Sequence, residues 1–200
     1  YNSDGLRGEM CGNGARCICR YAYEQGITGE SMTIQTDAGL VHGKRINEDT
    51  YRVRLNNPSV LELNYLNNIA YVELGNPGIP HALLEIPGLR WEDRELLRPM
   101  AEKIRHDPIF PKGVNVNFYT WLGENTVRIL TYERGVEDYT LACGTGSGSL
   151  AALLWKTGQI TDSLTAENPG GTLHLNISGT VSIHALHLEG PTEIISQISL

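Results

Sequence analysis

Two short motifs in this sequence each join a cysteine to a glycine-rich turn. The first is Cys11-Gly12-Asn13-Gly14 and the second is Cys143-Gly144-Thr145-Gly146, so both follow the pattern C-G-[NT]-G. Helix-compatible residues come after each motif, over 15–25 and 147–157. A cysteine at the start of a helix lies beside unpaired backbone N–H groups and the positive end of the helix dipole, which stabilise a thiolate. The same N–H groups bind a carboxylate, and glycine lets a ligand approach the backbone closely.

The two motifs are part of a longer internal repeat. In both copies a glycine closes the helical stretch at the same distance after the cysteine, at Gly26 and at Gly158. A strand-like run that ends at a glycine turn then follows in each copy, over 32–40 and 164–173. A single duplication of this kind predicts two similar lobes, because a solenoid needs several stacked copies.

Two cysteine loops that face each other across a cleft can invert the stereochemistry of an amino acid. One thiolate removes the α-proton from one face, while the other thiol delivers a proton to the opposite face. Negative charge then develops on the substrate carboxylate, where N–H groups in a closed cleft stabilise it. The pattern therefore predicts a racemase or epimerase without a cofactor, with Cys11 and Cys143 as its two acid/base groups.

The same residues have a purely structural interpretation, in which a buried cysteine is a small apolar residue and a glycine-rich turn is only a turn. The recurrence of the thiol in both copies favours chemistry for Cys11 and Cys143. Cys17 and Cys19 have no cysteine counterpart in the second copy, so we interpret them as structural. Their spacing from Cys11 does not match a usual zinc pattern, and we expect no metal site.

The elements that must position the two loops are mostly strands. Short runs with alternating apolar residues predict strands over 51–55, 69–74, 81–86, 114–122 and 126–132. One helix is predicted over 91–106, where apolar residues recur three or four positions apart. We therefore expect an α+β fold: two similar lobes of mostly antiparallel β-sheet, each wrapped around a central helix, with the active site in the cleft between them.

Composition limits the classes of partner. The formal net charge of -7 argues against a nucleic-acid or anionic-membrane surface, because phosphates attract concentrated Lys and Arg. No apolar run reaches the length of a membrane span, and four cysteines without a regular framework are typical of a reducing compartment. We expect a cytoplasmic protein that acts on a small amino-acid substrate, with no nucleic acid and no membrane as partners. A homodimer stays open.

Longer motifs around both cysteines resemble the diaminopimelate epimerase family. The longest matches are Asn2-Ser3-Asp4-Gly5, Met10-Cys11-Gly12-Asn13-Gly14-Ala15-Arg16-Cys17, Glu133-Arg134-Gly135-Val136 and Ala142-Cys143-Gly144-Thr145-Gly146. Shorter matches follow in family order: Gly75-Asn76-Pro77, Pro80-His81, Asn115-Val116-Asn117-Phe118, Pro169-Gly170-Gly171 and Gly190-Pro191. The resemblance covers essentially the whole chain.

The resemblance implies epimerisation of LL-diaminopimelate to meso-diaminopimelate without pyridoxal phosphate, a step in lysine and peptidoglycan-precursor biosynthesis. It implies four catalytic residues, Cys11, Cys143, His81 and Glu133. The substrate-binding positions that it implies are Asn2, Gly12, Asn13, Asn76, Asn115, Glu133, Arg134, Gly144 and Thr145. Glu133 and Arg134 suit the far end of such a substrate, because an ammonium binds a carboxylate and a carboxylate binds a guanidinium fork.

This chain departs from the family pattern in three places. The family carries an upstream segment with a further substrate-contacting asparagine, so the first lobe, over 1–62 with a returning strand over 188–200, is expected to lack N-terminal strands. The second lobe is expected over 63–187. Gly78 and Ile79 intervene before Pro80-His81, and one residue is added before Cys143, where Tyr139 takes the place of a glutamate.

Three other functions remain open beside the leading one. A racemase of the same fold could act on another amino acid, such as histidine, and contacts to the substrate tail would decide between the two. A non-catalytic relative would keep the fold without activity, although both cysteine loops and the Glu133-Arg134 pair are intact. A redox enzyme would need a reversible disulfide between Cys11 and Cys143 as its working state.

We predict that the 200-residue chain by itself is poorly stable and inactive. Missing strands would expose apolar core and leave open sheet edges. Thermal unfolding and a racemisation assay of the purified chain measure both properties. Full turnover by the chain alone would contradict the prediction.

Overall fold

The computed structural model describes residues 10–36, 39–66 and 68–195. Its helical elements are α1 (Gly12–Glu24), the 3-10 turn η1 (Trp91–Asp93), α2 (Arg94–Arg105) and α3 (Gly144–Lys156). Its strands are β1 (Ser31–Thr36), β2 (Gly39–Arg45), β3 (Thr50–Leu55), β4 (Pro58–Leu66), β5 (Ile69–Gly75), β6 (Gly78–Glu85), β7 (Asn115–Gly123), β8 (Thr126–Glu133), β9 (Asp138–Thr140), β10 (Ser163–Asn168), β11 (Gly171–Gly179) and β12 (Ile183–Pro191).

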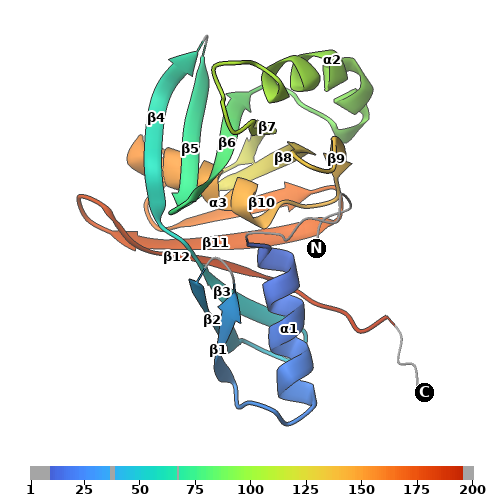
Figure 1. The fold of residues 1–200 in the computed structure, drawn as a ribbon, viewed down its shortest axis with the longest axis vertical. Helices are drawn as coiled ribbons and strands as arrows, with labels where there is room; N and C mark the ends of the chain where they lie inside the picture. Colours follow the sequence, from blue (N-terminus) through green and yellow to red (C-terminus); the bar gives the residue numbers. More distant parts are fainter. Residues whose placement is uncertain (1–9, 37–38, 67, 196–200) are drawn as a thin grey trace.

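The described strands form one twelve-stranded sheet in the order β1-β2-β3-β12-β11-β10-β8-β7-β6-β5-β4, with β9 paired to β8 beside this path. Neighbouring strands are antiparallel except for the pairs β6–β7 and β8–β10. Strand β12 pairs with β3 on one side and with β11 on the other, and it crosses between the two parts of the molecule in Figure 1. The expected α+β fold with a mostly antiparallel sheet is confirmed.

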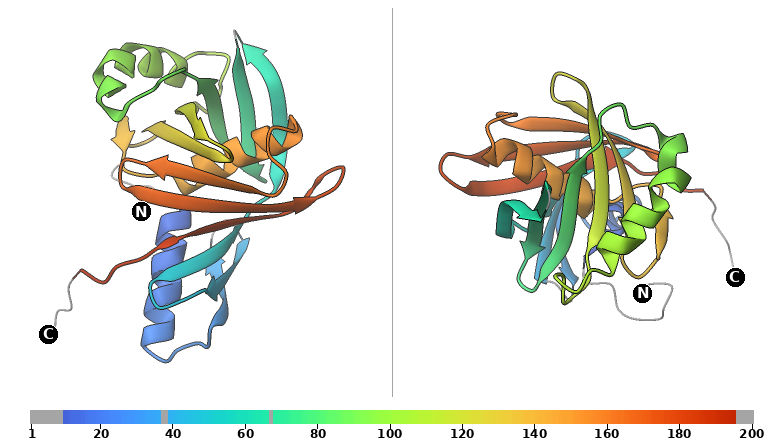
Figure 2. Two further views of the ribbon diagram at one scale, coloured as in Figure 1. Left: turned by 180° about the vertical axis from the view of Figure 1, so that it is seen from behind. Right: turned by 90° about the horizontal axis from the view of Figure 1, so that it is seen from above.

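The two cysteine helices differ in how far the sheet covers them. In α3, every residue from Gly144 to Leu154 is buried, and the helix runs inside the curve of the strands in Figures 1 and 2. Small residues make this possible: a Cβ on Gly148 would lie 2.5 Å from Leu55 Cδ1. In the described part of the chain, α1 buries one face against β2 and β3, while Ile18 and Tyr21 on its other side are exposed.

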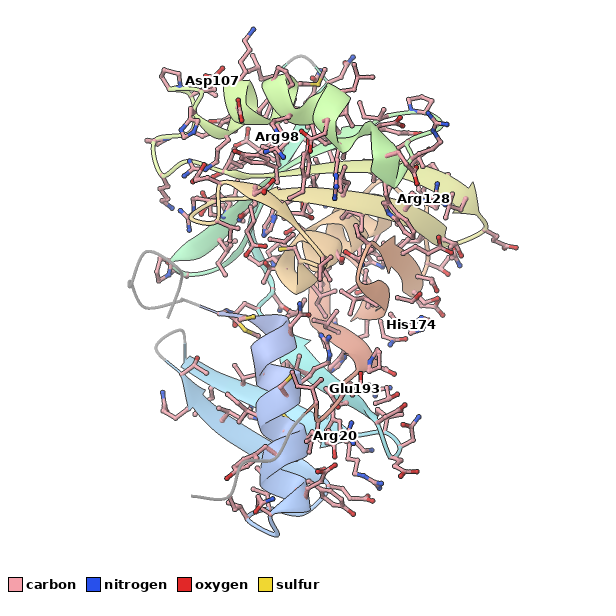
Figure 3. All side chains as sticks on the ribbon, turned by 90° about the vertical axis from the view of Figure 1, so that its right-hand side faces the viewer. Arg20, Arg98, Asp107, Arg128, His174 and Glu193 are labelled. Carbon is pink, nitrogen blue, oxygen red and sulfur yellow. The ribbon has the colours of Figure 1, made fainter. Side chains whose placement is uncertain are left out.

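The end of β12 fixes α1 to the sheet. Arg20 of α1 donates a hydrogen bond to the carbonyl of Thr192, which comes just after the strand. Figure 3 shows Arg20 close to Glu193, the residue after Thr192. Leu188, in the middle of β12, lies under both cysteine helices: its Cδ2 is 2.5 Å from a Cβ built on Gly12 and 2.6 Å from one built on Gly144.

The internal repeat reappears in the structure with the same register. Thr33 faces His42 across the β1–β2 hairpin, and Thr165 faces His174 across the β10–β11 hairpin. Each threonine Oγ1 lies within hydrogen-bond distance of the histidine Nδ1, at 3.2 Å in the first copy and 3.3 Å in the second. The hairpins therefore share a cross-strand contact as well as a backbone path, which supports a duplication.

Some element boundaries differ from the sequence predictions. Both cysteine helices begin at the glycine directly after the cysteine, because the cysteine Sγ accepts the orphan N–H of the third residue and so caps the helix. The sequence pattern does not predict strand β4, because its residues are only partly buried and do not alternate cleanly, as is typical of an edge strand that begins with proline. The predicted lobe boundary between residues 62 and 63 stays a prediction.

No helix within the described residues is long and apolar enough to cross a membrane. The apolar core of the described residues forms two clusters, one around α3 and the other between α2 and strands β5 to β8.

We predict that Leu188→Ala lowers the free energy of unfolding by about 2–5 kcal/mol, because it leaves a cavity where both helices meet the sheet. The matched control is Val181→Ala, whose side chain is 86% exposed and should change stability little. Urea unfolding of both variants measures the difference. Equal stabilities would show that Leu188 does not support this junction.

Candidate active site

The N-termini of α1 and α3 meet at two glycines. A Cβ built on Gly144 would lie 3.6 Å from the Cα of Gly12, and one built on Gly12 would lie 3.8 Å from the Cα of Gly144. Asn13 Nδ2 donates a hydrogen bond of 3.1 Å to the carbonyl of Ala142, which ties the first helix to the loop before Cys143. The positive ends of both helices therefore converge on one place, where an anion would be stabilised twice.

Cys11 and Cys143 occupy equivalent positions at these helix ends. Cys11 Sγ accepts a hydrogen bond from the Gly14 N–H at 3.3 Å, and Cys143 Sγ accepts one from the Gly146 N–H at 3.4 Å. Their surroundings differ, because Cys11 is exposed among the described residues while Cys143 is buried.

Burial and charge keep Cys143 protonated. Burial is the main cause that raises the pKa of Cys143 to about 12, and the nearby negative charge of Glu133 adds to it. Hydrogen bonds from Thr145 and from the Gly146 N–H act in the opposite direction but are outweighed. At neutral pH, Cys143 is therefore a thiol that can give a proton.

A chain of buried hydrogen bonds leads from Cys143 into the sheet. Thr145 Oγ1 lies 3.5 Å from Cys143 Sγ and 3.1 Å from His81 Nε2. On the far side of the ring, Asn117 Nδ2 lies 3.1 Å from His81 Nδ1, and Asn117 Oδ1 accepts from Thr131 Oγ1 at 2.9 Å. His81, Asn117 and Thr131 are all buried, so the chain is shielded from water.

The Asn117 amide determines which ring nitrogen of His81 carries the proton. Because the amide nitrogen can only donate, His81 Nδ1 must be the acceptor, and the proton lies on Nε2. His81 Nε2 then donates to Thr145 Oγ1, which also lies within hydrogen-bond distance of Cys143 Sγ. Burial first, and the charge of Arg134 second, lower the pKa of His81 to about 3. The ring is therefore neutral at physiological pH.

Glu133 and Arg134 lie at the end of β8, next to these hydrogen-bonded residues. The Arg134 backbone N–H donates to Asn115 Oδ1 at 2.9 Å, and Asn115 Nδ2 donates to the carbonyl of Pro80 at 3.0 Å. Burial raises the pKa of Glu133, although the nearby Thr140 hydroxyl acts against this. His81 and Asn115 face each other in the parallel register of β6 and β7, so the sheet brings Glu133, Arg134 and Asn115 beside His81 and Cys143.

The structure brings most of the predicted site residues together. Those that gather around the two helix ends are Cys11, Gly12, Asn13, His81, Asn115, Glu133, Arg134, Cys143, Gly144 and Thr145. Asn76 is exposed in the turn between β5 and β6, and Asn2 lies outside the described residues. Within those residues, no three His, Cys, Asp or Glu side chains gather as a metal site would require.

Sequence reasoning gave no role to Asn117 and Thr131. One indication was available, because Asn115 and Asn117 stand two residues apart in an otherwise apolar strand and must share one face of it. Nothing in the sequence alone shows that this face meets His81, which comes from a neighbouring strand.

The fold is shared with solved structures of low sequence identity. A probable proline racemase from Agrobacterium radiobacter superposes with a TM-score of 0.69 at 19% identity, covering 96% of this chain and 68% of the other. A phenazine biosynthesis protein of the PhzF family from Bacillus anthracis gives a TM-score of 0.69 at 15% identity, covering 94% of this chain and 74% of the other. The chain therefore shares the α+β fold of these two structures.

Sequence relatives identify the family of this chain. The family model for diaminopimelate epimerase matches residues 74–187. The diaminopimelate epimerase of Archaeoglobus fulgidus is 34% identical over 193 residues, which cover 89% of this chain and 67% of the relative. That of Methanocella arvoryzae is 34% identical over 211 residues, covering 98% and 72%. That of Aquifex aeolicus is 39% identical over 167 residues, covering 80% and 58%.

This chain belongs to the diaminopimelate epimerase family, a family of isomerases. The resemblance drawn from the cysteine motifs is confirmed, and so is the expectation of an enzyme of the epimerase class. The chain spans between 58% and 72% of the length of these three relatives.

We predict that His81 makes folding stability depend on pH. Its pKa is about 3 when folded and returns to the ordinary 6.5 when unfolded, so only the unfolded chain binds this proton between those values. Stability is therefore full above pH 6.5 and falls below it, by at most about 1.4 kcal/mol per pH unit.

Urea unfolding between pH 4 and pH 8 tests this prediction. His81→Gln should reduce the loss of stability at low pH, while the control His184→Gln, at an exposed histidine, should leave it unchanged. The same pH dependence in wild type and His81→Gln would contradict a neutral, buried His81.

Proposed function

We propose that the protein containing this chain interconverts LL- and meso-diaminopimelate without a cofactor, with Cys11 and Cys143 as the two acid/base groups. The observation that carries this proposal is the meeting of two equivalent helix ends at Gly12 and Gly144, each capped by a cysteine. Family membership supports the substrate. The reaction would serve the biosynthesis of lysine and of peptidoglycan precursors.

The paired helix ends suit the α-carboxylate of the substrate. The first N–H groups of a helix have no partner within it, and both helices direct theirs toward the junction of Gly12 and Gly144. When the α-proton leaves, negative charge spreads onto this carboxylate, so the same N–H groups bind the transition state more strongly than the ground state. Asn13 and Thr145, the next residues of the two helices, complete this cradle.

The α-proton leaves on one side of the substrate and another arrives on the opposite side. In one direction, the Cys11 thiolate takes the α-proton: the C–H bond breaks and an S–H bond forms. The Cys143 thiol then gives its proton to the other face of the α-carbon, which agrees with a pKa of about 12 that keeps Cys143 protonated. After the turnover, Cys11 is a thiol and Cys143 is a thiolate.

The reverse direction needs a deprotonated Cys143. Glu133 is close enough to raise the pKa of Cys143, and its own pKa is raised by burial, so it is suited to take the thiol proton. The resulting thiolate accepts hydrogen bonds from the Gly146 N–H and from Thr145, whose hydroxyl is oriented by His81. In this proposal, His81 acts by orienting the Thr145 hydroxyl.

The far end of diaminopimelate carries its own ammonium and carboxylate groups. Arg134 supplies a guanidinium and Glu133 a carboxylate from adjacent positions at the end of β8, beside Asn115. This pair suits diaminopimelate better than amino acids with an apolar or neutral tail, because a carboxylate pairs with an ammonium and a guanidinium fork pairs with a carboxylate. It therefore supports diaminopimelate over histidine as the substrate.

We predict that the full-length protein exchanges the α-proton of LL-diaminopimelate when incubated in deuterated water. Cys11→Ala and Cys143→Ala should each lower the rate of epimerisation by about a hundredfold to ten-thousandfold, the range for loss of a general acid or base. Cys17→Ala is the matched control, because Cys17 is an exposed thiol on the same helix as the Cys11 loop. NMR of the α-proton and chiral chromatography measure exchange and inversion.

Two outcomes would contradict the proposal. Full activity in either the Cys11 or the Cys143 variant would exclude the two-base mechanism. Exchange on histidine but not on diaminopimelate would assign the enzyme a different substrate within the same fold.

A further inference from the structure

The turn between β8 and β9 carries the two residues proposed to bind the substrate tail. Glu133 ends β8, Asp138 begins β9, and Arg134 is the first residue of the turn. The N–H groups of Val136 and Glu137 donate to the Glu133 carbonyl at 3.2 Å and 2.9 Å. The backbone that positions Glu133 and Arg134 therefore depends on the conformation at Glu137.

Glu137 adopts a backbone conformation that is unfavourable for its residue type. Its φ is 58°, in the left-handed region where a side chain approaches the following carbonyl. Glycine adopts this region freely, and Asn or Asp more readily than Glu. Something in the surrounding structure must therefore hold Glu137 in place.

Three hydrogen bonds converge on one oxygen of the Glu137 side chain. Glu137 Oε1 accepts from Arg105 Nε at 3.1 Å, from Arg105 Nη2 at 2.6 Å and from the Gly135 N–H at 2.9 Å. The Glu137 carbonyl accepts a further bond from the Tyr132 hydroxyl at 2.8 Å. Although burial acts to raise it, the Gly135 N–H and Arg105 lower the pKa of Glu137, so the carboxylate is charged at neutral pH.

Arg105 is fixed from its other side by the segment that follows α2. It is the last residue of α2, and its side chain is only 14% exposed. A Cβ on Gly113 would lie 2.2 Å from Arg105 Nη1 and 3.5 Å from Arg134 Cδ, so both arginine side chains pack on this glycine. Arg134 Nη1 also donates to the Lys112 carbonyl at 2.8 Å. Arg105 thus connects α2 and Gly113 to the turn.

A second arginine of α2 contacts the end of the same turn. Arg98 Nη2 donates to Asp138 Oδ1 at 2.8 Å, and in Figure 3 Arg98 lies on the side of α2 that faces the sheet. The Asp138 side chain is 58% exposed, so this pair is weaker than the one at Glu137.

We propose that Arg105 and Glu137 are positioning residues for substrate-tail recognition: their ion pair holds the left-handed turn that presents Glu133 and Arg134. This inference rests on the proposed function. Neither residue touches the reacting atoms. In the direction that starts with the Cys11 thiolate, Glu133 takes no proton, so loss of the pair should weaken substrate binding more than it slows proton transfer.

We predict that Arg105→Met in the full-length protein raises KM for LL-diaminopimelate about tenfold and changes kcat less than about threefold. Glu137→Ala should act in the same way. The double variant Arg105→Met with Glu137→Gly should recover most of the lost affinity, because glycine adopts this conformation without the steric cost that the ion pair offsets. Arg94→Met is the matched control, since Arg94 is an exposed arginine of the same helix that contacts Glu95.

Two results would overturn the inference: an unchanged KM in Arg105→Met, or no recovery in the double variant with glycine. Amide hydrogen exchange at Val136 and Glu137 separates this inference from the proposed function. If wild-type protein does not turn over diaminopimelate, the proposed function fails. Faster exchange in Arg105→Met would still show that the pair holds the turn, and unchanged exchange would contradict it.

Discussion

The close approach of Gly12 and Gly144 is the constraint on which the rest of the site depends. Two helices can bring their positive ends together only where neither residue carries a side chain, and a Cβ on either glycine would overlap Leu188. This junction places two capping cysteines within electrostatic reach of each other and creates one anion site from two helix dipoles. Strand β12 contacts both helix ends through Leu188. The same strand pairs with β3 on one side and with β11 on the other, so it joins the two parts of the sheet.

The two halves of the site are related by duplication but differ in electrostatics. Cys143 lies at the end of a fully enclosed helix, so its thiol stays protonated, whereas Cys11 caps a helix that the described residues cover on one face. Among the described residues, the polar chain through Thr145, His81 and Asn117 lies in the second half. In the proposed mechanism Cys143 first acts as an acid, and its burial is a physical reason for this thiol to stay protonated.

Much of the site could be predicted from sequence because its signals are local. The pattern C-G-x-G with a following helix specifies a capped helix end, and its recurrence indicates a duplication that the equivalent hairpins bear out. Other features could not be predicted in this way. The pairing of Asn117 with His81 depends on the parallel register of β6 and β7, and the pairing of Arg105 with Glu137 depends on where α2 packs. Such contacts join residues far apart in the chain.

The sequence by itself determined the two cysteine loops, their helices and the family, because residue types at short spacing dictate helix capping and backbone freedom. Tertiary structure alone decided which thiol is buried, which nitrogen of His81 carries a proton, and how the turn at Glu137 is held. Burial and hydrogen-bond direction are properties of surroundings built from distant strands. For that reason, the chemical identity of the site was local information, whereas its electrostatic tuning arose only when the chain had folded.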